Sequence, residues 1–428
     1  MRRVSTALAA LILSSPVFAD APAPPPVSGS VGAPEGRLPQ YGPFLIEEAL
    51  EPRVRFWIDV YAKYSSWETV VHHLDHPEIV YAVVNTRGNS QGMRKERDRA
   101  RKLLLRLQEK NEAIARGKLR AADLREEERK LWEKFSRLAD PEKFRKAANA
   151  IRGQAGLRDR LIDALYVSGR YLPRMEKVFE RMDLPGEVAY LPFVESGFNK
   201  QARSKVGASG IWQFMPATGR LFLRVDEEVD ERNDPMRAAE AAARLMRQNY
   251  DMLKEWPLAV TAYNHGALGM ARAVKETGST SLARIIEKYE GKTFGFASSN
   301  FYASFLAALE VAKNYGKYIG EVAKARKLEF DEFVMTDYVA FQTILEFTGV
   351  DEKEFRELNP ALTPAVYSGD LLIPVGYTVR VPMDDRGDFL QRYEKIPASL
   401  KFKKQKSAEA VPAETAPAAL PEVSGSPE

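Results

Sequence analysis

Apolar and aromatic residues recur at helical spacing along most of the chain. In RVRFWIDVYAKYSSWETVVHHL, residues 53–74, they fall on one helical face. The segment that begins RKERDRARKLLLRLQEKNEAIARGKLR predicts one or two long amphipathic helices, broken near Gly117, with their charges towards solvent. We therefore expect a helical region over residues 43–157 that includes a charged, solvated arm.

The pattern changes twice further along the chain. Residues 158–320 are denser in apolar residues, are interrupted by turn signals such as DLPGE and KVGASG, and predict a compact helical domain without strands. After Phe330, AFQTILEFTG and DEKEFRELNP predict two short helices, and GDLLIPVG and YTVRVP predict strands. We expect a small α+β module over residues 328–383, and so a mainly α fold overall.

Both ends of the chain lack the pattern of a packed fold. The basic MRR, an apolar run too short to cross a bilayer and VFA before Asp20 predict a signal peptide over residues 1–19 rather than a membrane anchor. Residues 20–42 are rich in Pro, Gly, Ser and Ala and predict a disordered linker. Residues 398–428 are Lys-rich and then Ala- and Pro-rich, which predicts a disordered tail.

Composition narrows the class of protein. The 428 residues include no Cys, so the chain has no disulfide and no thiol for a lipid anchor. Loss of residues 1–19 would remove two arginines and leave 61 basic residues against 59 acidic ones, a balance that argues against a nucleic-acid partner. We expect an exported, soluble protein with no transmembrane segment after cleavage of the signal peptide.

One acidic residue stands out from its surroundings. Glu195 ends the apolar run VAYLPFV and is followed at once by the turn signal Ser-Gly. Burial of an unpaired carboxylate is costly, and that cost raises the pKa. A carboxyl that stays protonated near neutral pH is suited to general acid catalysis of glycoside cleavage. There is no second carboxylate from Ser196 to Arg224, so the usual two-acid mechanism has no obvious partner in this segment.

The segment ESGFNKQARSKVGASGIWQFMPATGRLF, with TAYNHG at residues 261–266, resembles the catalytic segment of family 23 lytic transglycosylases and goose-type lysozymes. The upstream residues and the module after Phe330 look most like the group of membrane-bound lytic murein transglycosylases D, and the module resembles a divergent LysM unit that lacks the usual opening Gly-Asp-Thr. The residues that carry the resemblance are Glu195, Ser196, Phe198, Asn199, Ala202, Ser204, Gly207, Ala208, Gly210, Trp212, Gln213, Met215, Pro216, Thr218, Ala262, Tyr263 and Asn264.

The resemblance implies a lysozyme-like helical domain over residues 158–320 that acts on peptidoglycan glycan strands without a cofactor. In this family one Glu, here Glu195, first donates and then accepts a proton, and a tyrosine hydroxyl, here that of Tyr263, lies near it. The product would carry a 1,6-anhydro end. Positions that match the family's substrate-binding residues are Ser204, Gly207, Gly210, Gln213, Met215, Asn264 and Tyr302. The two glycines also fit simple turns, and Tyr263 also fits a core tyrosine.

Two residues depart from the family's pattern. Ser298 stands where a sugar-binding Glu is expected, which puts one polar contact and the substrate preference in doubt. His265 stands where a small residue is common, and it could reach the cleft as a second titrating group. The other three histidines lie in HHLDHP, residues 72–77, which lacks a fourth ligand at motif spacing. We interpret them as surface residues and expect no metal.

These observations predict a periplasmic lytic transglycosylase that cleaves the β-1,4 bond between N-acetylmuramic acid and N-acetylglucosamine. Two alternatives remain: a hydrolytic muramidase on the same fold, and an inactive scaffold that binds peptidoglycan. The first would give reducing ends and the second no cleavage. The sequence identifies no protein partner.

Overall fold

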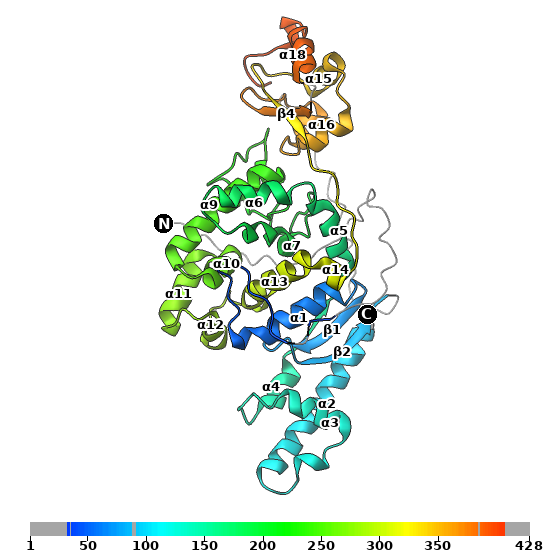
Figure 1. Cartoon of the computed structure of the whole chain (residues 1–428), viewed down its shortest axis with the longest axis vertical. Helices are drawn as coiled ribbons and strands as arrows, with labels where there is room; N and C mark the ends of the chain where they lie inside the picture. The colour runs from blue at the N-terminus through cyan, green and yellow to red at the C-terminus, as the bar shows by residue number, and fades with distance from the viewer. Residues whose placement is uncertain (1–31, 35, 88–90, 384–385, 407–428) are drawn as a thin grey trace, which may run out of the picture. The chain divides into compact units, whose positions relative to one another are not determined.

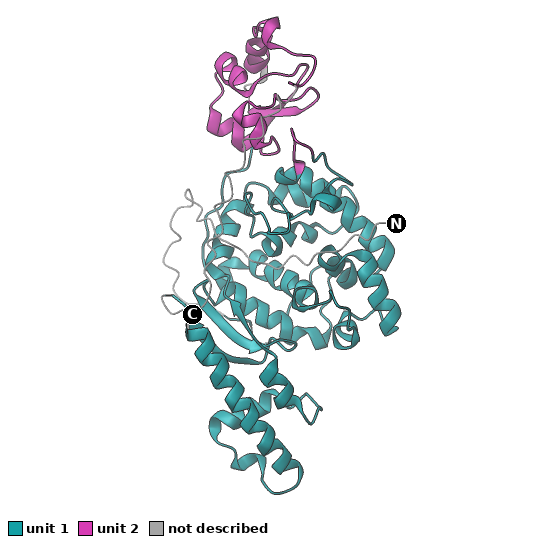
Figure 2. Ribbon diagram, turned by 180° about the vertical axis from the view of Figure 1, so that it is seen from behind, with its two compact units in different colours: residues 1–225, 232–328 teal, residues 226–231, 329–428 magenta. Residues whose placement is uncertain are grey.

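The computed structural model describes residues 32–34, 36–87, 91–383 and 386–406 (Figure 1). The chain divides into two compact units (Figure 2). Unit 1 combines residues 1–225 with residues 232–328, and unit 2 combines residues 226–231 with residues 329–428. Helices predominate in the described residues, which confirms the mainly α fold class. The predicted signal peptide, residues 1–19, lies outside the described residues.

Helix α13 (Phe296–Lys313) forms the centre of unit 1 (Figure 1). Almost every side chain in this helix is buried, as expected for a helix that is hydrophobic all round. Helices α1 (Glu51–Ala62), α7 (Leu191–Glu195) and α10 (Trp256–His265) pack against it. The other helices of this body are α5 (Arg158–Ser168), α6 (Leu172–Glu180), α8 (Pro216–Gly219), α9 (Pro235–Leu253), α11 (Ala267–Thr277), α12 (Leu282–Lys288) and α14 (Tyr315–Tyr318).

The segment before α1 belongs to the same core. Leu38 and Phe44 are buried in the cluster that also contains α13. The Glu47 carboxylate accepts hydrogen bonds from the backbone N–H of Leu282 at 2.9 Å and from the Ser281 hydroxyl, and so caps α12. The predicted disordered linker, residues 20–42, is therefore wrong for its described part, because burial of apolar side chains fixes residues that composition alone assigns to a linker.

Three strands interrupt the region predicted to be helical. Strands β1 (Glu68–His73), β2 (Val80–Asn85) and β3 (Ile151–Ala155) form an antiparallel sheet in the order β2-β1-β3. The helical prediction fails after Ala62 because the backbone N–H and hydroxyl of Ser66 donate to Asp159 at 2.7 and 2.6 Å and turn the chain. The paired valines that follow favour a strand.

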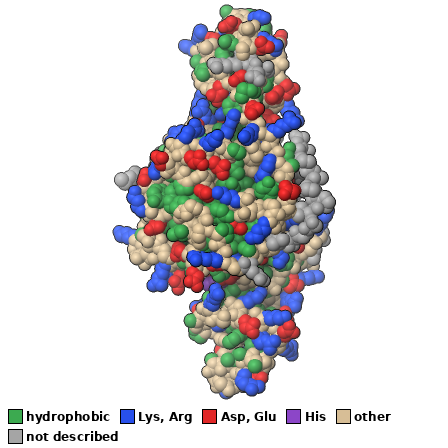
Figure 3. Space-filling model, viewed as in Figure 1, with side chains coloured by type: hydrophobic (Ala, Val, Ile, Leu, Met, Phe, Trp, Pro, Cys, Tyr) green, Lys and Arg blue, Asp and Glu red, His purple; other side chains and the backbone are tan. Residues whose placement is uncertain are grey.

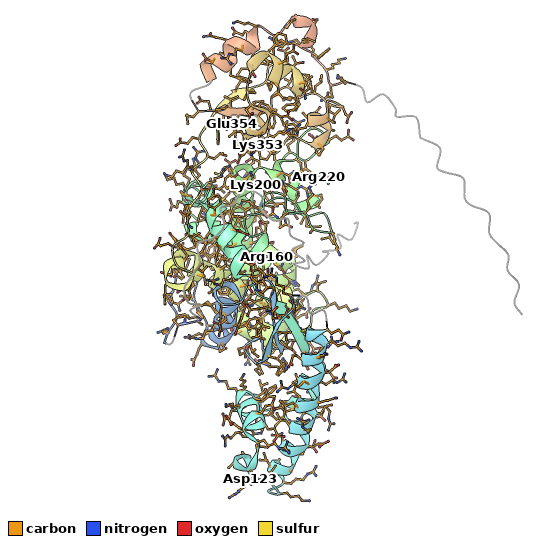
Figure 4. All side chains as sticks on the ribbon, turned by 90° about the vertical axis from the view of Figure 1, so that its right-hand side faces the viewer. Asp123, Arg160, Lys200, Arg220, Lys353 and Glu354 are labelled. Atoms are coloured by element: carbon orange, nitrogen blue, oxygen red, sulfur yellow. The ribbon has the colours of Figure 1, made fainter. Side chains whose placement is uncertain are left out.

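The predicted charged arm is present, and it has a core of its own. It contains α2 (Gly92–Ala115), α3 (Glu126–Lys134) and α4 (Lys143–Asn149), with the predicted break near Gly117. Lys and Arg side chains alternate with Asp and Glu along its surface (Figure 3). Asp123 marks its tip, away from Arg160 and Lys200 in the helical body (Figure 4). Its buried apolar residues are Ile79, Leu103, Leu104, Leu107, Leu124, Leu131, Phe135, Phe144, Ala147 and Ala148.

Unit 2 combines helices with a two-stranded sheet, but the predicted strand GDLLIPVG, residues 369–376, is wrong, because this segment makes only an isolated bridge between Ile373 and Val339. Strands β4 (Phe330–Val334) and β5 (Thr378–Pro382) pair antiparallel, with helices α15 (Phe341–Thr348), α16 (Glu352–Leu358) and α17 (Pro364–Ser368) between them in sequence. The buried Asn359 side chain joins α16 to β5, since it donates to the Arg380 carbonyl and accepts from the Arg380 N–H, both at 2.8 Å. Its resemblance to a LysM unit stays a prediction.

The structure extends this module beyond the predicted boundary at residue 383. Helix α18 (Arg386–Glu394) contributes the buried Phe389 and Tyr393 to the core of unit 2. Beyond it, Tyr338 and Phe402 exchange two backbone hydrogen bonds of 2.9 Å. The Gln405 side chain bonds both the N–H and the carbonyl of Leu372. The predicted disordered tail, residues 398–428, is therefore wrong as far as Lys406.

We expect a chain that ends after Pro397 to melt at a lower temperature than one that ends after Lys406. The shorter chain loses the contacts of Phe402 and Gln405 and the ion pair of 2.6 Å between Lys403 and Asp337. The four hydrogen bonds that Phe402 and Gln405 make with Tyr338 and Leu372 contribute about 1 kcal/mol each, so the destabilisation of unit 2 is on the order of 4 kcal/mol. Calorimetry of the two truncated chains measures it, and identical melting curves would contradict the role of this segment.

Candidate active site

Glu195 is the last residue of α7, a short helix whose other four side chains are buried. The chain turns sharply after it, with positive φ at Gly197 and Phe198, and Phe198 returns to pack against Phe193 at a ring distance of 4.7 Å. The hydroxyl of Ser196 donates to the Ile211 carbonyl at 2.8 Å and ties the turn to the following loop. These contacts place the Glu195 carboxyl at the edge of the apolar core.

Burial raises the pKa of Glu195 to about 8. No charged neighbour among the described residues contributes to this shift, so removal from water is its cause. At neutral pH most of the carboxyl is therefore protonated, and it can donate a proton as well as take one back. The sequence-based expectation of a raised pKa agrees with this environment.

Two tyrosines lie close enough to Glu195 for its negative charge to raise their pKa values. Burial, and after it the Glu195 carboxylate, raise the pKa of Tyr263. The same two causes raise the pKa of Tyr61, against a hydrogen bond of 2.9 Å between its hydroxyl and that of Ser304. Tyr263 was predicted from the sequence. Tyr61 was missed, because it comes from α1, and only its place on the buried face of a helix distinguishes it in the sequence.

The Tyr263 hydroxyl donates its proton to the backbone carbonyl of Trp212 at 2.9 Å. A tyrosine hydroxyl has one proton, so its oxygen remains as an acceptor. It can therefore accept a hydrogen bond from a protonated Glu195 and cannot at the same time donate to the ionised form.

The loop after Glu195 is fixed by backbone contacts. The Ser204 hydroxyl accepts from the Ala208 N–H at 2.9 Å, which leaves its own proton free to donate. Gly207 is exposed, and a side chain there would meet only Pro216. Gly210 is buried with a φ of +75°, and a Cβ there would lie 1.8 Å from the Arg232 carbonyl oxygen. Gly207 thus remains open to a ligand, whereas the fold itself explains Gly210.

Gln213 has an unusual backbone, with a φ of +49°. Its side-chain Nε2 donates to the carbonyls of Gly210 at 2.7 Å and Ala202 at 3.1 Å, which directs the amide. Its Oε1 has no hydrogen-bond donor among the described residues and is available to a ligand. Met215 is half-buried at the start of α8. Both positions are compatible with the predicted groove.

Asn264 follows Tyr263 on α10 and is half-buried. Its Oδ1 accepts a hydrogen bond of 2.9 Å from the Ser298 hydroxyl. Ser298 is 1% exposed, so it reaches a ligand only through Asn264. His265 is buried against Gly269, Tyr289 and Phe294, and burial lowers its pKa. The suggestion that His265 titrates in the cleft is therefore wrong.

Tyr302 does not reach the site as predicted. It is 1% exposed, and its hydroxyl donates to the Leu45 carbonyl at 2.9 Å. That bond holds the segment before α1 against α13. The sequence motif identified the residue but not the direction of its side chain.

The histidines predicted at the surface are also corrected. His72 and His73 are buried in β1, and burial lowers the pKa of each to about 4. His73 Nδ1 accepts from the backbone N–H of Asp75 at 3.0 Å, so it has a structural partner. No group of three or more His, Asp or Glu side chains in the described residues is arranged to hold a metal ion. The absence of a metal stays a prediction.

Comparisons with known proteins agree with this site. Residues 176–286 match the family described as the Transglycosylase SLT domain, and all the catalytic and substrate-binding residues predicted from the sequence, except Tyr302, lie within them. The membrane-bound lytic murein transglycosylase D of Escherichia coli, strains K12 and O6:H1, is 32% identical over 192 residues, which cover 42% of this chain and 40% of each relative. The match thus spans less than half of the length of these relatives.

Among solved structures, the lytic transglycosylase Slt of Pseudomonas aeruginosa aligns with 55% of this chain and 35% of its own, at 15% identity and a TM-score of 0.29. The family match and the two relatives confirm the resemblance to the Transglycosylase SLT domain and to lytic murein transglycosylase D. The lysozyme-like form of the domain stays a prediction.

Proposed function

We propose that this protein is a peptidoglycan lytic transglycosylase, which cleaves the β-1,4 bond between N-acetylmuramic acid and N-acetylglucosamine without adding water. The observation that carries the proposal is the carboxyl of Glu195, whose pKa is raised to about 8 by removal from water, inside a segment that matches a transglycosylase domain. The names of the relatives support the same substrate class.

Glu195 acts first as the acid. It protonates the oxygen that leaves from C1 of the muramic sugar, and the C1–O bond to the next sugar breaks. The 6-hydroxyl of the same muramic sugar then bonds to C1, and its proton returns to Glu195. One proton is given and one regained, so the carboxyl ends protonated and no second carboxylate is required.

The surrounding residues position these groups. Tyr263, anchored on the Trp212 carbonyl, orients the acid form of Glu195. We also assign a positioning role to Tyr61, whose hydroxyl is hydrogen-bonded to that of Ser304 and whose pKa is raised in part by Glu195. We assign sugar binding to Ser204, Gly207, Gln213, Met215 and Asn264, whose side chains or backbone are at least partly exposed.

Mass spectrometry of the fragments released from purified sacculi tests the proposal. We expect fragments with 1,6-anhydro ends. Reducing ends would show a hydrolytic muramidase, and no soluble fragments would show a scaffold that only binds. The muramidase alternative lacks a specific observation in its favour, since no further carboxylate among the described residues contributes to the pKa shift of Glu195.

The raised pKa of Glu195 predicts the pH dependence of cleavage. The reaction begins with a protonated acid, so kcat/KM should be constant below the pKa and fall about tenfold per pH unit above it. We expect the fall to begin near pH 8, where the carboxyl loses its proton. Initial rates on sacculi at fixed ionic strength measure the profile, and a fall that begins near pH 4 to 5 would contradict a buried acid.

The site and its substrate imply an envelope location. We propose that the chain is exported by the segment at residues 1–19 and acts in the periplasm. No helix in the described residues is long and apolar enough to cross a membrane. We assign the reaction to the protein side chains without a cofactor, and we propose that unit 2 is a divergent LysM-like module.

A further inference from the structure

Two buried polar side chains, Ser298 and His265, form a chain of hydrogen bonds that ends at Asn264. The Ser298 hydroxyl lies 2.9 Å from Asn264 Oδ1 and 3.3 Å from His265 Nδ1. Ser298 and His265 are 1% and 6% exposed, whereas Asn264 is half-buried. Of the three, only Asn264 has appreciable access to a ligand.

The number of protons fixes the direction of these bonds. The Asn264 carbonyl oxygen only accepts, so the single proton of Ser298 points to it. The Ser298 oxygen must then accept from His265, which requires the neutral tautomer with its proton on Nδ1. Burial, and after it the charge of Arg272, lower the pKa of His265 and keep the ring neutral.

The direction of these hydrogen bonds decides which atom of the Asn264 amide, Oδ1 or Nδ2, is available to a ligand. Its Oδ1 is occupied by Ser298, and no group in the described residues accepts a hydrogen bond from its Nδ2. The two Nδ2 protons are therefore available to a ligand. A carboxylate at position 298, as the resembled family carries, would accept from Nδ2 instead and turn Oδ1 outward.

We propose that Ser298 is a positioning residue that makes Asn264 a hydrogen-bond donor to the glycan, and so selects sugars that offer an acceptor there. The acceptor class is the carbonyl oxygen of an N-acetyl group. The ammonium of an N-deacetylated sugar offers only donors, so it meets the Nδ2 protons without forming a bond. The inference rests on the proposed function for the identity of the ligand. It extends that function by naming the N-acetyl group as the part of the sugar that Asn264 recognises.

Binding of short glycans tests the selectivity independently of cleavage. Calorimetry with the full chain compares a tetrasaccharide of N-acetylglucosamine with the corresponding tetrasaccharide of glucosamine. We expect the wild type to prefer the acetylated sugar, and Ser298→Ala to reduce the ratio of the two dissociation constants about five- to tenfold, the value of one directed hydrogen bond. Ser298→Thr keeps the hydroxyl and should restore the wild-type ratio.

Ser299→Ala is the matched control. The Ser299 hydroxyl also lies on the first turn of α13, but it donates to the Phe296 carbonyl at 3.3 Å and makes no hydrogen bond with Asn264. This variant should leave the ratio unchanged. An unchanged ratio in Ser298→Ala, or equal loss in both alanine variants, would overturn the proposal.

The histidine tautomer gives a second readout that a purely structural role would not move. With only four histidines, the side-chain ¹⁵N spectrum is simple, and a His265→Asn variant assigns the signal. We expect the Nδ1-protonated form in the wild type and a shift towards the Nε2-protonated form in Ser298→Ala. An Nε2-protonated ring in the wild type would reverse the direction of the bonds and overturn the proposal. If the wild type shows the expected tautomer and selectivity but releases no fragments from sacculi, the proposed function fails and this inference stands.

Discussion

Glu195→Gln should fold normally and lose cleavage of sacculi by about 10³-fold or more in kcat. Gln keeps the shape of the side chain but can neither give a proton to the leaving oxygen nor take one from the 6-hydroxyl, and such transfers contribute about 10²- to 10⁴-fold. The rate of release of soluble fragments measures the loss, and circular dichroism checks the fold.

Glu176→Gln is a matched control for that experiment. Burial also raises the pKa of Glu176, but this residue lies on α6 and interacts with Tyr190 and Lys313 rather than with the candidate site. It should keep its activity within a few-fold of the wild type. Residual activity of Glu195→Gln within tenfold of the wild type would show that another acid performs the chemistry.

Gly210→Ala should destabilise unit 1 strongly. The backbone φ of +75° is strained for any residue with a side chain, and the new Cβ would meet the Arg232 carbonyl oxygen at 1.8 Å, so the two backbone segments would have to separate. We expect a loss on the order of 3 kcal/mol and a lower melting temperature.

Gly207→Ala measures the backbone strain of a positive φ without the steric clash that Gly210→Ala adds. Its φ is +90°, but its nearest neighbour would be Pro216 at 3.6 Å, an ordinary contact, so only the strain of about 1 kcal/mol remains. Thermal melting of the two variants measures the difference. Equal destabilisation of both would contradict the close packing of Arg232 against Gly210.

The raised pKa of Glu195 could be predicted from the sequence because its environment is local. The apolar residues of α7 and the turn after Glu195 are contiguous, so a buried carboxyl followed directly from the pattern. Tyr61 could not be predicted in the same way. It reaches Glu195 through the packing of α1 against α13, and no spacing in the sequence reports that contact.

Side-chain direction accounts for most of the errors at the site. The motifs predicted that Tyr302 and His265 line the cleft, yet both side chains point into the core. The Tyr302 hydroxyl donates a hydrogen bond to the Leu45 carbonyl, and aromatic rings pack against His265. A motif fixes which residue stands at a position, whereas packing decides where its side chain points.

The errors in the fold have a similar origin. Residues 68–73 carry apolar side chains that fit a helical face, but tertiary pairing with β2 and β3 makes them a strand. Residues 38–42 belong to a segment with the composition of a linker, but the side chain of Leu38 is buried in the core. In both places long-range contacts override the local preference.

The most direct test of the central claim is digestion of sacculi in water enriched in heavy oxygen. If the 6-hydroxyl of the same sugar attacks C1 and gives its proton to Glu195, the new muramic ends carry no label and are lighter than the hydrolytic product by one water. Heavy oxygen at C1 of the new ends would show that water attacks instead, and would contradict the account of a single carboxyl that closes an anhydro ring.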